Sequence, residues 1–165
     1  MNNRITATEA KELYTTLATK HKLPEFASFD SEFEIVDAIQ RYAFAPEYPL
    51  RFIRRSMLDK FYSWTNYFHG YIQPSQQSII LMQEYGQFTD AERKQILDHV
   101  RQLMILTRTG ATLDLLSTQE QDVEFIINAF SEWLKVKDKL QVFVKKTAES
   151  WKKPIKEDDF EPAGM

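Results

Sequence analysis

Residues 119–151 read QEQDVEFIINAFSEWLKVKDKLQVFVKKTAESW and contain neither glycine nor proline. Nine positions in this stretch follow one another at spacings of three and four: Val123, Ile126, Phe130, Trp133, Lys137, Leu140, Val144, Thr147 and Trp151. This spacing predicts one long α-helix with a heptad-like apolar seam, which Lys137 and Thr147 interrupt. Some thirty helical residues extend roughly 50 Å, more than the width of a small domain. The helix is therefore expected either to kink near residues 135–139 or to pack with its end on another chain.

Four capping boxes mark further helix starts, each with a Ser or Thr followed three residues later by Glu. The pairs are Thr6 with Glu9, Ser31 with Glu34, Thr89 with Glu92, and Ser117 with Glu120. In such a pair the hydroxyl and the carboxylate each accept from a backbone N–H group that the first helical turn leaves without a partner. Every pair precedes apolar residues at helical spacing, and strand patterns are nearly absent. The sequence therefore predicts an all-α fold.

The same signals place the helices, with Pro and Gly residues as their stops. We expect helices over residues 7–21, 32–44, 49–70, 75–85, 90–108 and 119–151, where Ser75 caps the fourth and Gly110 ends the fifth. They form a five- or six-helix bundle, which we expect to be a single domain over residues 1–151. Residues 152–165 read KKPIKEDDFEPAGM, with two prolines and seven charges, and are expected to form a disordered charged tail.

Composition excludes several classes of protein. The chain has 165 residues, a net charge of −3 and no cysteine. The lack of cysteine excludes disulfide frameworks, thiolate zinc sites and cysteine nucleophiles. It also suits a reducing compartment, so we expect a cytoplasmic protein. Charges within residues 4–12 rule out a signal peptide at that position. The uncharged window of residues 61–83 contains too many polar groups for a membrane helix.

Sequence signatures of enzymes are nearly absent. The four glycines stand at positions 70, 86, 110 and 164, so no glycine-rich loop can hold a phosphate. No Glu-x-x-His or His-Glu-x-x-His pair is present, and His21, His69 and His99 fall on separate expected helices. We therefore assign no catalytic residue, no metal and no cofactor.

Two short fragments resemble parts of the motif of HEPN-type ribonucleases, which are small helical bundles. The first, Arg93 to His99, has the Arg-x-x-x-x-x-His spacing, but six helical residues rotate by 240° and separate the two side chains. The second, Asn66-Tyr-Phe-His69-Gly-Tyr71, resembles the Asn-x-x-His-x-Tyr ending but has Thr65 where the arginine of the family stands. This resemblance implies a ribonuclease as a third alternative for the function.

Ten aromatic residues fall between Tyr42 and Tyr71, in a stretch whose net charge is about +2. On a helix, one continuous stripe faces the core: Leu50, Ile53, Met57, Phe61, Trp64, Phe68 and Tyr71. Arg51, Arg55, Tyr62 and His69 share one flank of the same helix. The stretch is therefore either a buried aromatic core helix or a surface that neutralises phosphates and stacks on bases. For the second reading, the candidate nucleic-acid contacts are Arg51, Arg54, Arg55, Lys60, Tyr62 and His69.

The long last helix supplies the other candidate surface. Its apolar seam either forms the centre of a monomeric bundle or pairs with a second copy or a partner helix. For the second case, the candidate interface residues are Trp133, Leu140, Phe143, Val144 and Trp151. The sequence thus predicts a small non-enzymatic module that acts by helix-to-helix contact with itself or another protein. A nucleic-acid-binding subunit is the alternative.

Overall fold

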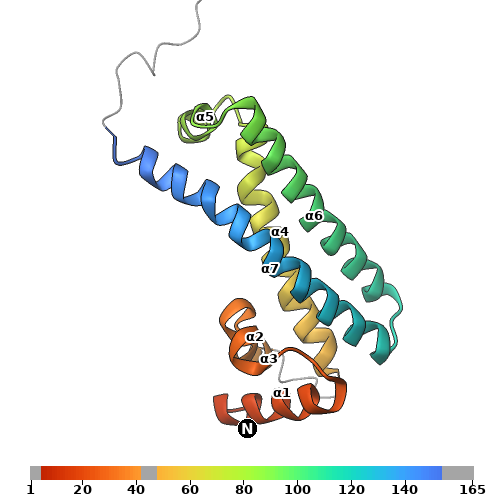
Figure 1. Ribbon diagram of the computed structural model, residues 1–165. Helices are drawn as coiled ribbons and strands as arrows, with labels where there is room; N and C mark the ends of the chain where they lie inside the picture. Colours follow the sequence, from red (N-terminus) through yellow and green to blue (C-terminus); the bar gives the residue numbers. More distant parts are fainter. Residues whose placement is uncertain (1–4, 42–47, 154–165) are drawn as a thin grey trace, which may run out of the picture. The chain divides into compact units, whose positions relative to one another are not determined.

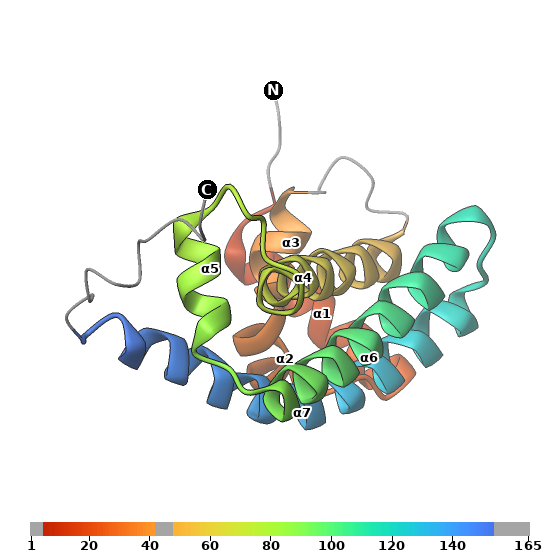
Figure 2. The same cartoon turned by 90° about the horizontal axis from the view of Figure 1, so that it is seen from above.

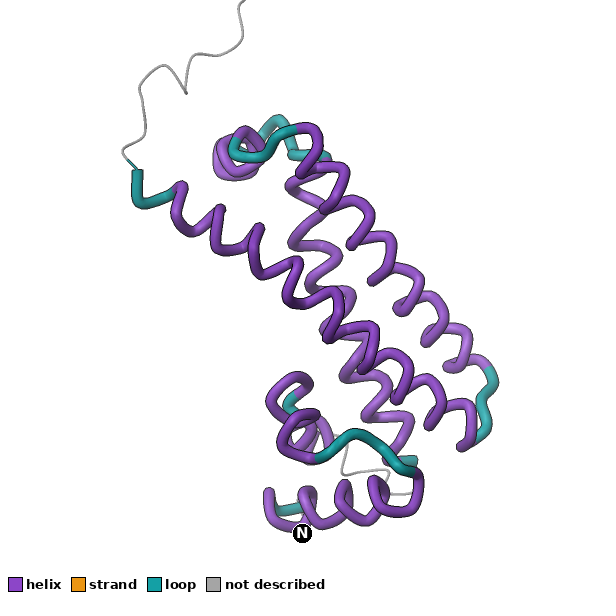
Figure 3. Tube along the Cα trace, viewed as in Figure 1, coloured by secondary structure: helices purple, strands orange, loops and turns teal. Residues whose placement is uncertain are grey.

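The computed structural model describes residues 5–41 and 48–153, and over these residues it is built of helices without a strand (Figures 1 and 3). The helices are α1 (Ala7–His21), α2 (Phe26–Phe33), α3 (Ile35–Arg41), α4 (Pro49–Ile72), α5 (Ile79–Gly86), α6 (Asp90–Leu115) and α7 (Gln119–Ser150). The all-α prediction is therefore confirmed, with seven helices described where five or six were predicted. The predicted long last helix is present as α7. From residue 154 onward, the predicted tail lies outside the described residues.

The chain divides into two compact units. The first contains Met1–Tyr62 and Ile105–Trp133, and the second contains Ser63–Met104 and Leu134–Met165. Helices α4, α6 and α7 each contribute to both units. The single domain over residues 1–151 stays a prediction.

The core of the first unit is a chain of aromatic rings. The ring centres of Phe29 and Phe33 lie 5.2 Å apart, Phe33 lies 5.8 Å from Phe61, and Phe61 lies 5.8 Å from Trp133. These tilted and edge-to-face pairs are the arrangements that aromatic quadrupoles favour. Around this core, α1, α2 and α3 pack on one another (Figure 2). Phe61 of α4 thus belongs to this core, whereas Phe52 is half-buried and Tyr62 is exposed.

The predicted helix over residues 32–44 is wrong at its start. Ser31 lies inside α2, where its hydroxyl donates to the carbonyl of Ser28 at 2.9 Å, so the predicted capping box with Glu34 does not form. Glu34 instead ends α2 in the left-handed conformation, with φ of 50°. Asp30 Oδ1 then accepts from the backbone N–H of Val36 at 3.0 Å in the first turn of α3. Parts of two helices, α2 and α3, therefore stand where one helix was predicted. Residues 42–44 of that prediction lie outside the described chain.

Two of the other capping boxes are confirmed. Thr6 Oγ1 accepts from Glu9 N at 3.3 Å, and Thr6 N donates to the Glu9 carboxylate at 2.7 Å. Thr89 and Glu92 make the same reciprocal pair at 3.2 and 2.8 Å. These contacts satisfy backbone donors at the starts of α1 and α6.

The cap of α7 stands one residue later than predicted. Gln121 N donates to Thr118 Oγ1 at 3.3 Å, and Thr118 N donates to Gln121 Oε1 at 2.9 Å. Thr118 and Gln121 therefore replace the predicted pair of Ser117 and Glu120. Glutamine can replace glutamate in this cap because its side-chain amide oxygen accepts a hydrogen bond, as a carboxylate oxygen does.

Gly110 was predicted to end a helix, but α6 continues past it to Leu115. A Cβ atom at this buried position would lie 2.9 Å from Phe125 Cζ and 3.0 Å from Leu58 Cδ1. The residue therefore permits close packing of α6 on α4 and α7 within the first unit. It does not supply the special backbone angles of a helix stop, since it has no positive φ.

The second unit has its own aromatic core. Ring centres lie 5.6 Å apart for Phe68 and Tyr71, 5.0 Å for Tyr71 and Phe88, and 5.9 Å for Phe88 and Phe143. Helix α5 begins at Ile79, where Ser78 Oγ accepts from Leu81 N at 3.3 Å, so the predicted start at Ser75 is three residues early.

Over the described residues, no helix is long and apolar enough to cross a membrane.

Candidate functional site

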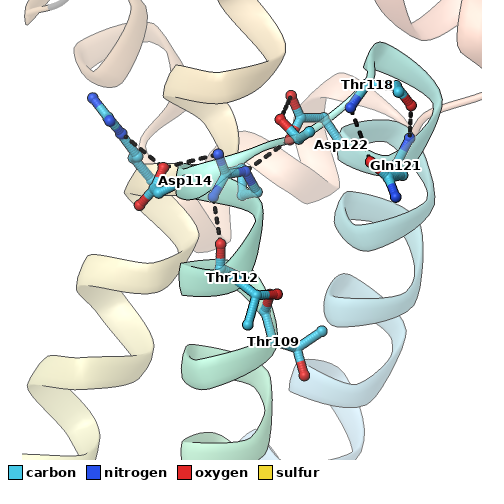
Figure 4. A network of polar contacts seen from close by, with 10 residues as sticks. Thr109, Thr112, Asp114, Thr118, Gln121 and Asp122 are labelled. Atoms are coloured by element: carbon cyan, nitrogen blue, oxygen red, sulfur yellow. Dashed lines mark hydrogen bonds and ion pairs between the residues drawn. The ribbon is translucent and has the colours of Figure 1, made fainter.

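Arg54 is fully buried in the first unit, and all of its guanidinium nitrogens have acceptors. Nε donates to Asp122 Oδ1 at 2.8 Å, Nη2 donates to Asp114 Oδ1 at 2.9 Å, and Nη1 donates to the carbonyl of Gly110 at 2.5 Å. Figure 4 shows Asp114 and Asp122 in this polar network, with Asp122 beside the Thr118–Gln121 cap. Arg54 was proposed as a nucleic-acid contact, and its placement corrects that: a buried guanidinium requires its ion pairs and cannot reach a phosphate.

Arg55 and Tyr62, by contrast, border an open groove of about 340 Å³ in the first unit. The groove is lined by Arg55, Leu58, Asp59, Tyr62, Thr107 and Asp114. Arg55 Nε lies 3.3 Å from Asp114 Oδ1, and Tyr62 is 54% exposed. The carboxylates of Asp59 and Asp114 line the same groove and offset part of the positive charge of Arg55.

The two other predicted cations of this helix already contact neighbouring groups. The Arg51 guanidinium lies 5.5 Å from the centre of the Tyr48 ring. Lys60 Nζ donates to the carbonyl of Glu32 and lies 5.4 Å from the ring centres of Phe33 and Trp133. Lys60 therefore helps to hold the first unit together.

His69 belongs to the second unit and borders an open groove of about 600 Å³. The groove is lined by Asn66, Tyr67, His69 and Gly70 of α4, by residues 73–75, and by Leu81 and Glu84 of α5. The predicted basic and aromatic flank of α4 is thus divided between the two units, with Arg51, Arg55 and Tyr62 in the first.

In the fragments that resemble a ribonuclease motif, Asn66 and His69 line one groove, whereas Tyr71, Arg93 and His99 contact other groups. Tyr71 is buried, and its hydroxyl donates to the Tyr67 hydroxyl at 2.7 Å. Burial raises the pKa of Tyr71 well above its usual range. Arg93 Nη1 donates to the Tyr85 carbonyl at 3.2 Å, whereas His99 Nδ1 lies 3.3 Å from Gln102 Oε1.

Most of the interface residues predicted on α7 are interior. Trp133, Leu140 and Phe143 are buried, and Trp133 Nε1 donates to Glu32 Oε2 at 2.8 Å. These three side chains pack within the described chain, as they would if the seam formed the centre of a bundle, and their part in an interface stays a prediction. Val144 is half-buried. Trp151 remains 39% exposed at the end of α7.

Helix α5 carries exposed apolar side chains that were not among the predicted site residues. Ile79, Ile80 and Met82 are 61, 60 and 44% exposed, and none of the eight residues of α5 is buried. We call these three residues the α5 face. The apolar run at 79–82 was visible in the sequence, but nothing in it indicated that neighbouring helices leave this run uncovered.

Trp151 lies next to this helix. Its indole Nε1 donates to Glu84 Oε1 at 2.9 Å, which joins the end of α7 to the side of α5 within the second unit. A second group of exposed apolar side chains, Leu115 and Leu116, lies in the first unit at the end of α6.

Comparison with known proteins found no matching family model, no similar curated protein and no similar solved structure.

Within residues 5–41 and 48–153, no group of three or more histidine or acidic side chains is placed to hold a metal ion.

Proposed function

We propose that the protein is an interaction module that binds another protein chain, a partner or a second copy of itself, through the α5 face. One observation carries this proposal. Helix α5 exposes three large apolar side chains, Ile79, Ile80 and Met82, and buries none of its own residues. Several exposed apolar residues on one short helix mark a binding surface more often than single exposed apolar residues do.

Trp151 extends the proposed surface. It is the one residue of the predicted α7 interface that remains clearly exposed, and its bond to Glu84 holds it against α5. Tryptophan is enriched among the residues that dominate protein interfaces. The expected helix-to-helix contact is therefore retained, but its position moves from the middle of α7 to α5 and the end of α7.

Photo-crosslinking in the native cells tests this proposal. A benzophenone amino acid replaces Ile80 in one variant and Asp98, an exposed residue of the same unit, in a control variant. The proposal expects a discrete protein adduct from position 80 and none from position 98. Equal adduct patterns, or none at position 80, would remove the α5 face as an interface. Light scattering over a concentration range then separates self-association from binding to another protein.

Nucleic-acid binding is a second candidate, favoured by the exposed Tyr62 ring in the same groove as Arg55. Arg51, Arg55, Tyr62 and His69 are the contacts that this candidate retains. Its test is binding of single-stranded RNA and DNA at low salt, followed by a salt titration. Binding that is absent, or that is unchanged by Arg51→Glu with Arg55→Glu, would reject it.

A further inference from the structure

We propose that the groove beside the α5 face, which His69 and Glu84 line, receives a lysine or arginine side chain of the bound protein segment. This inference rests on the proposed function, since it gives the chemistry of the partner that binds α5. The expected partner is a peptide segment that combines apolar residues with one basic residue.

The groove and the α5 face share one helix. Ile80 and Glu84 are four residues apart in α5, so their side chains lie on the same side of the helix, one turn apart. Leu81 faces the opposite wall of the groove, where a Cβ atom at Gly70 would lie 2.9 Å from Leu81 Cδ2. A segment that covers Ile80 therefore passes the carboxylate of Glu84.

The groove is electrostatically suited to a cation. Among the described residues that line it, Glu84 is the only Asp, Glu, Lys or Arg. Its Oε1 accepts from the Trp151 indole, which is a neutral donor and leaves the negative charge in place. The other wall is the carboxyl end of α4, at His69 and Gly70, where the last helical carbonyls add partial negative charge.

An organic cation fits these groups better than a metal ion does. Ca²⁺ and Mg²⁺ sites use several oxygen ligands and usually more than one carboxylate, whereas this groove offers one. The stem of a lysine or arginine can lie along Leu81 and Pro74 while its charged end reaches Glu84. Tyr67, which is 42% exposed, offers an aromatic ring to the same cation.

Selection from a random dodecapeptide phage library on the full-length protein tests the inference. We expect enriched peptides with apolar residues and one Arg or Lys, whose binding is lost with Ile80→Asp. The best peptide is then synthesised in two forms. One keeps its basic residue, and the other has a neutral residue in its place: citrulline for an Arg, or norleucine for a Lys. Titration calorimetry compares the two peptides on the wild type, on Glu84→Gln, and on the control Asp98→Asn. Glu84→Gln keeps an amide oxygen for the Trp151 indole.

The neutral replacement is expected to weaken binding about tenfold on the wild type and on Asp98→Asn, since a charge-assisted hydrogen bond is lost. When the protein is the Glu84→Gln variant, the same neutral replacement in the peptide is expected to change the affinity by less than about threefold. Peptides that need Ile80 but show no basic residue, or no dependence on Glu84, would overturn the cation site and leave the α5 face as the interface. A selection that yields no peptide dependent on Ile80 would count against both proposals.

Discussion

Arg54 Nε donates to Asp122 Oδ1 at 2.8 Å, although the two residues are 68 positions apart in the sequence. The same guanidinium bonds to Asp114 and to the Gly110 carbonyl, so one buried side chain of α4 joins the end of α6 and the start of α7. A buried charge of this kind is stable only while its partners are in place.

Removal of the Arg54 side chain is expected to be strongly destabilising. Arg54→Ala leaves two carboxylates without their shared cation, and the free energy of unfolding should fall by about 3–5 kcal/mol. The control Arg55→Ala removes a half-exposed pair with Asp114 and should cost less than about 1 kcal/mol. Urea denaturation measures both values, and similar losses for the two variants would contradict the network.

Gly110 is expected to tolerate no side chain. Gly110→Ala gains about 1 kcal/mol of helix propensity, but its methyl group meets Phe125 and Leu58, and overpacking costs about 1–3 kcal/mol. We expect a net loss of stability in thermal or urea denaturation. Gly86→Ala is the matched control, since a Cβ atom there has no neighbour within 4 Å. A Gly110→Ala variant as stable as Gly86→Ala would show that the helices do not approach closely here.

The pair of Glu92 and Lys146 predicts part of the response to acid. Lys146 Nζ donates to both carboxylate oxygens of Glu92, at 2.6 and 2.7 Å, and with Thr89 it holds the pKa of Glu92 below its usual range. The pair is therefore stabilising above the unfolded-state pKa of about 4.3, and its contribution is lost as the pH falls through the lower folded-state value.

Glu92→Gln should therefore lower stability at pH 7 and flatten the loss of stability on acidification below about pH 5. Urea denaturation over a pH series measures this slope, with Asp98→Asn as the control in the same unit. Parallel curves for the wild type and Glu92→Gln would show that the pair does not form in solution.

The α5 face should contribute little to folding, because its side chains are exposed. Ile80→Ala is expected to change the free energy of unfolding by less than about 0.5 kcal/mol. Ile96 in the same unit is fully buried, and Ile96→Ala should cost about 2–5 kcal/mol. If Ile80→Ala proved as costly as Ile96→Ala, the residue would be part of the core.

Local signals in the sequence located most helices, but two local features, a helix break and a helix cap, were missed. The bounds of α1 and α7 and the caps at Thr6 and Thr89 depend on neighbouring residues, so the sequence predicted them. The break at Glu34 was missed because a non-glycine residue rarely adopts positive φ. The cap at Thr118 was missed because two adjacent hydroxyl residues, Ser117 and Thr118, both offered a capping pattern.

The site residues show the same limit. Arg54 and Arg55 look alike in the sequence, but Arg54 is buried with ion pairs to Asp114 and Asp122, whereas Arg55 is half-exposed. The apolar residues of α7 and α5 also look alike, and Phe143 is buried whereas Ile80 is exposed. Helical spacing identifies an apolar face, but which helices cover it depends on contacts distant in sequence.

Alkylation of single cysteines tests the α5 face most directly, because the natural chain contains no cysteine. Ile80→Cys and the control Asp98→Cys are each labelled with a maleimide, once in the purified protein at low concentration and once in fresh native lysate. We predict that position 80 reacts several times more slowly in the lysate than in the purified protein, while position 98 reacts at the same rate in both. Equal rates at position 80 in the two samples would show that the α5 face is not covered, and would contradict the proposed function.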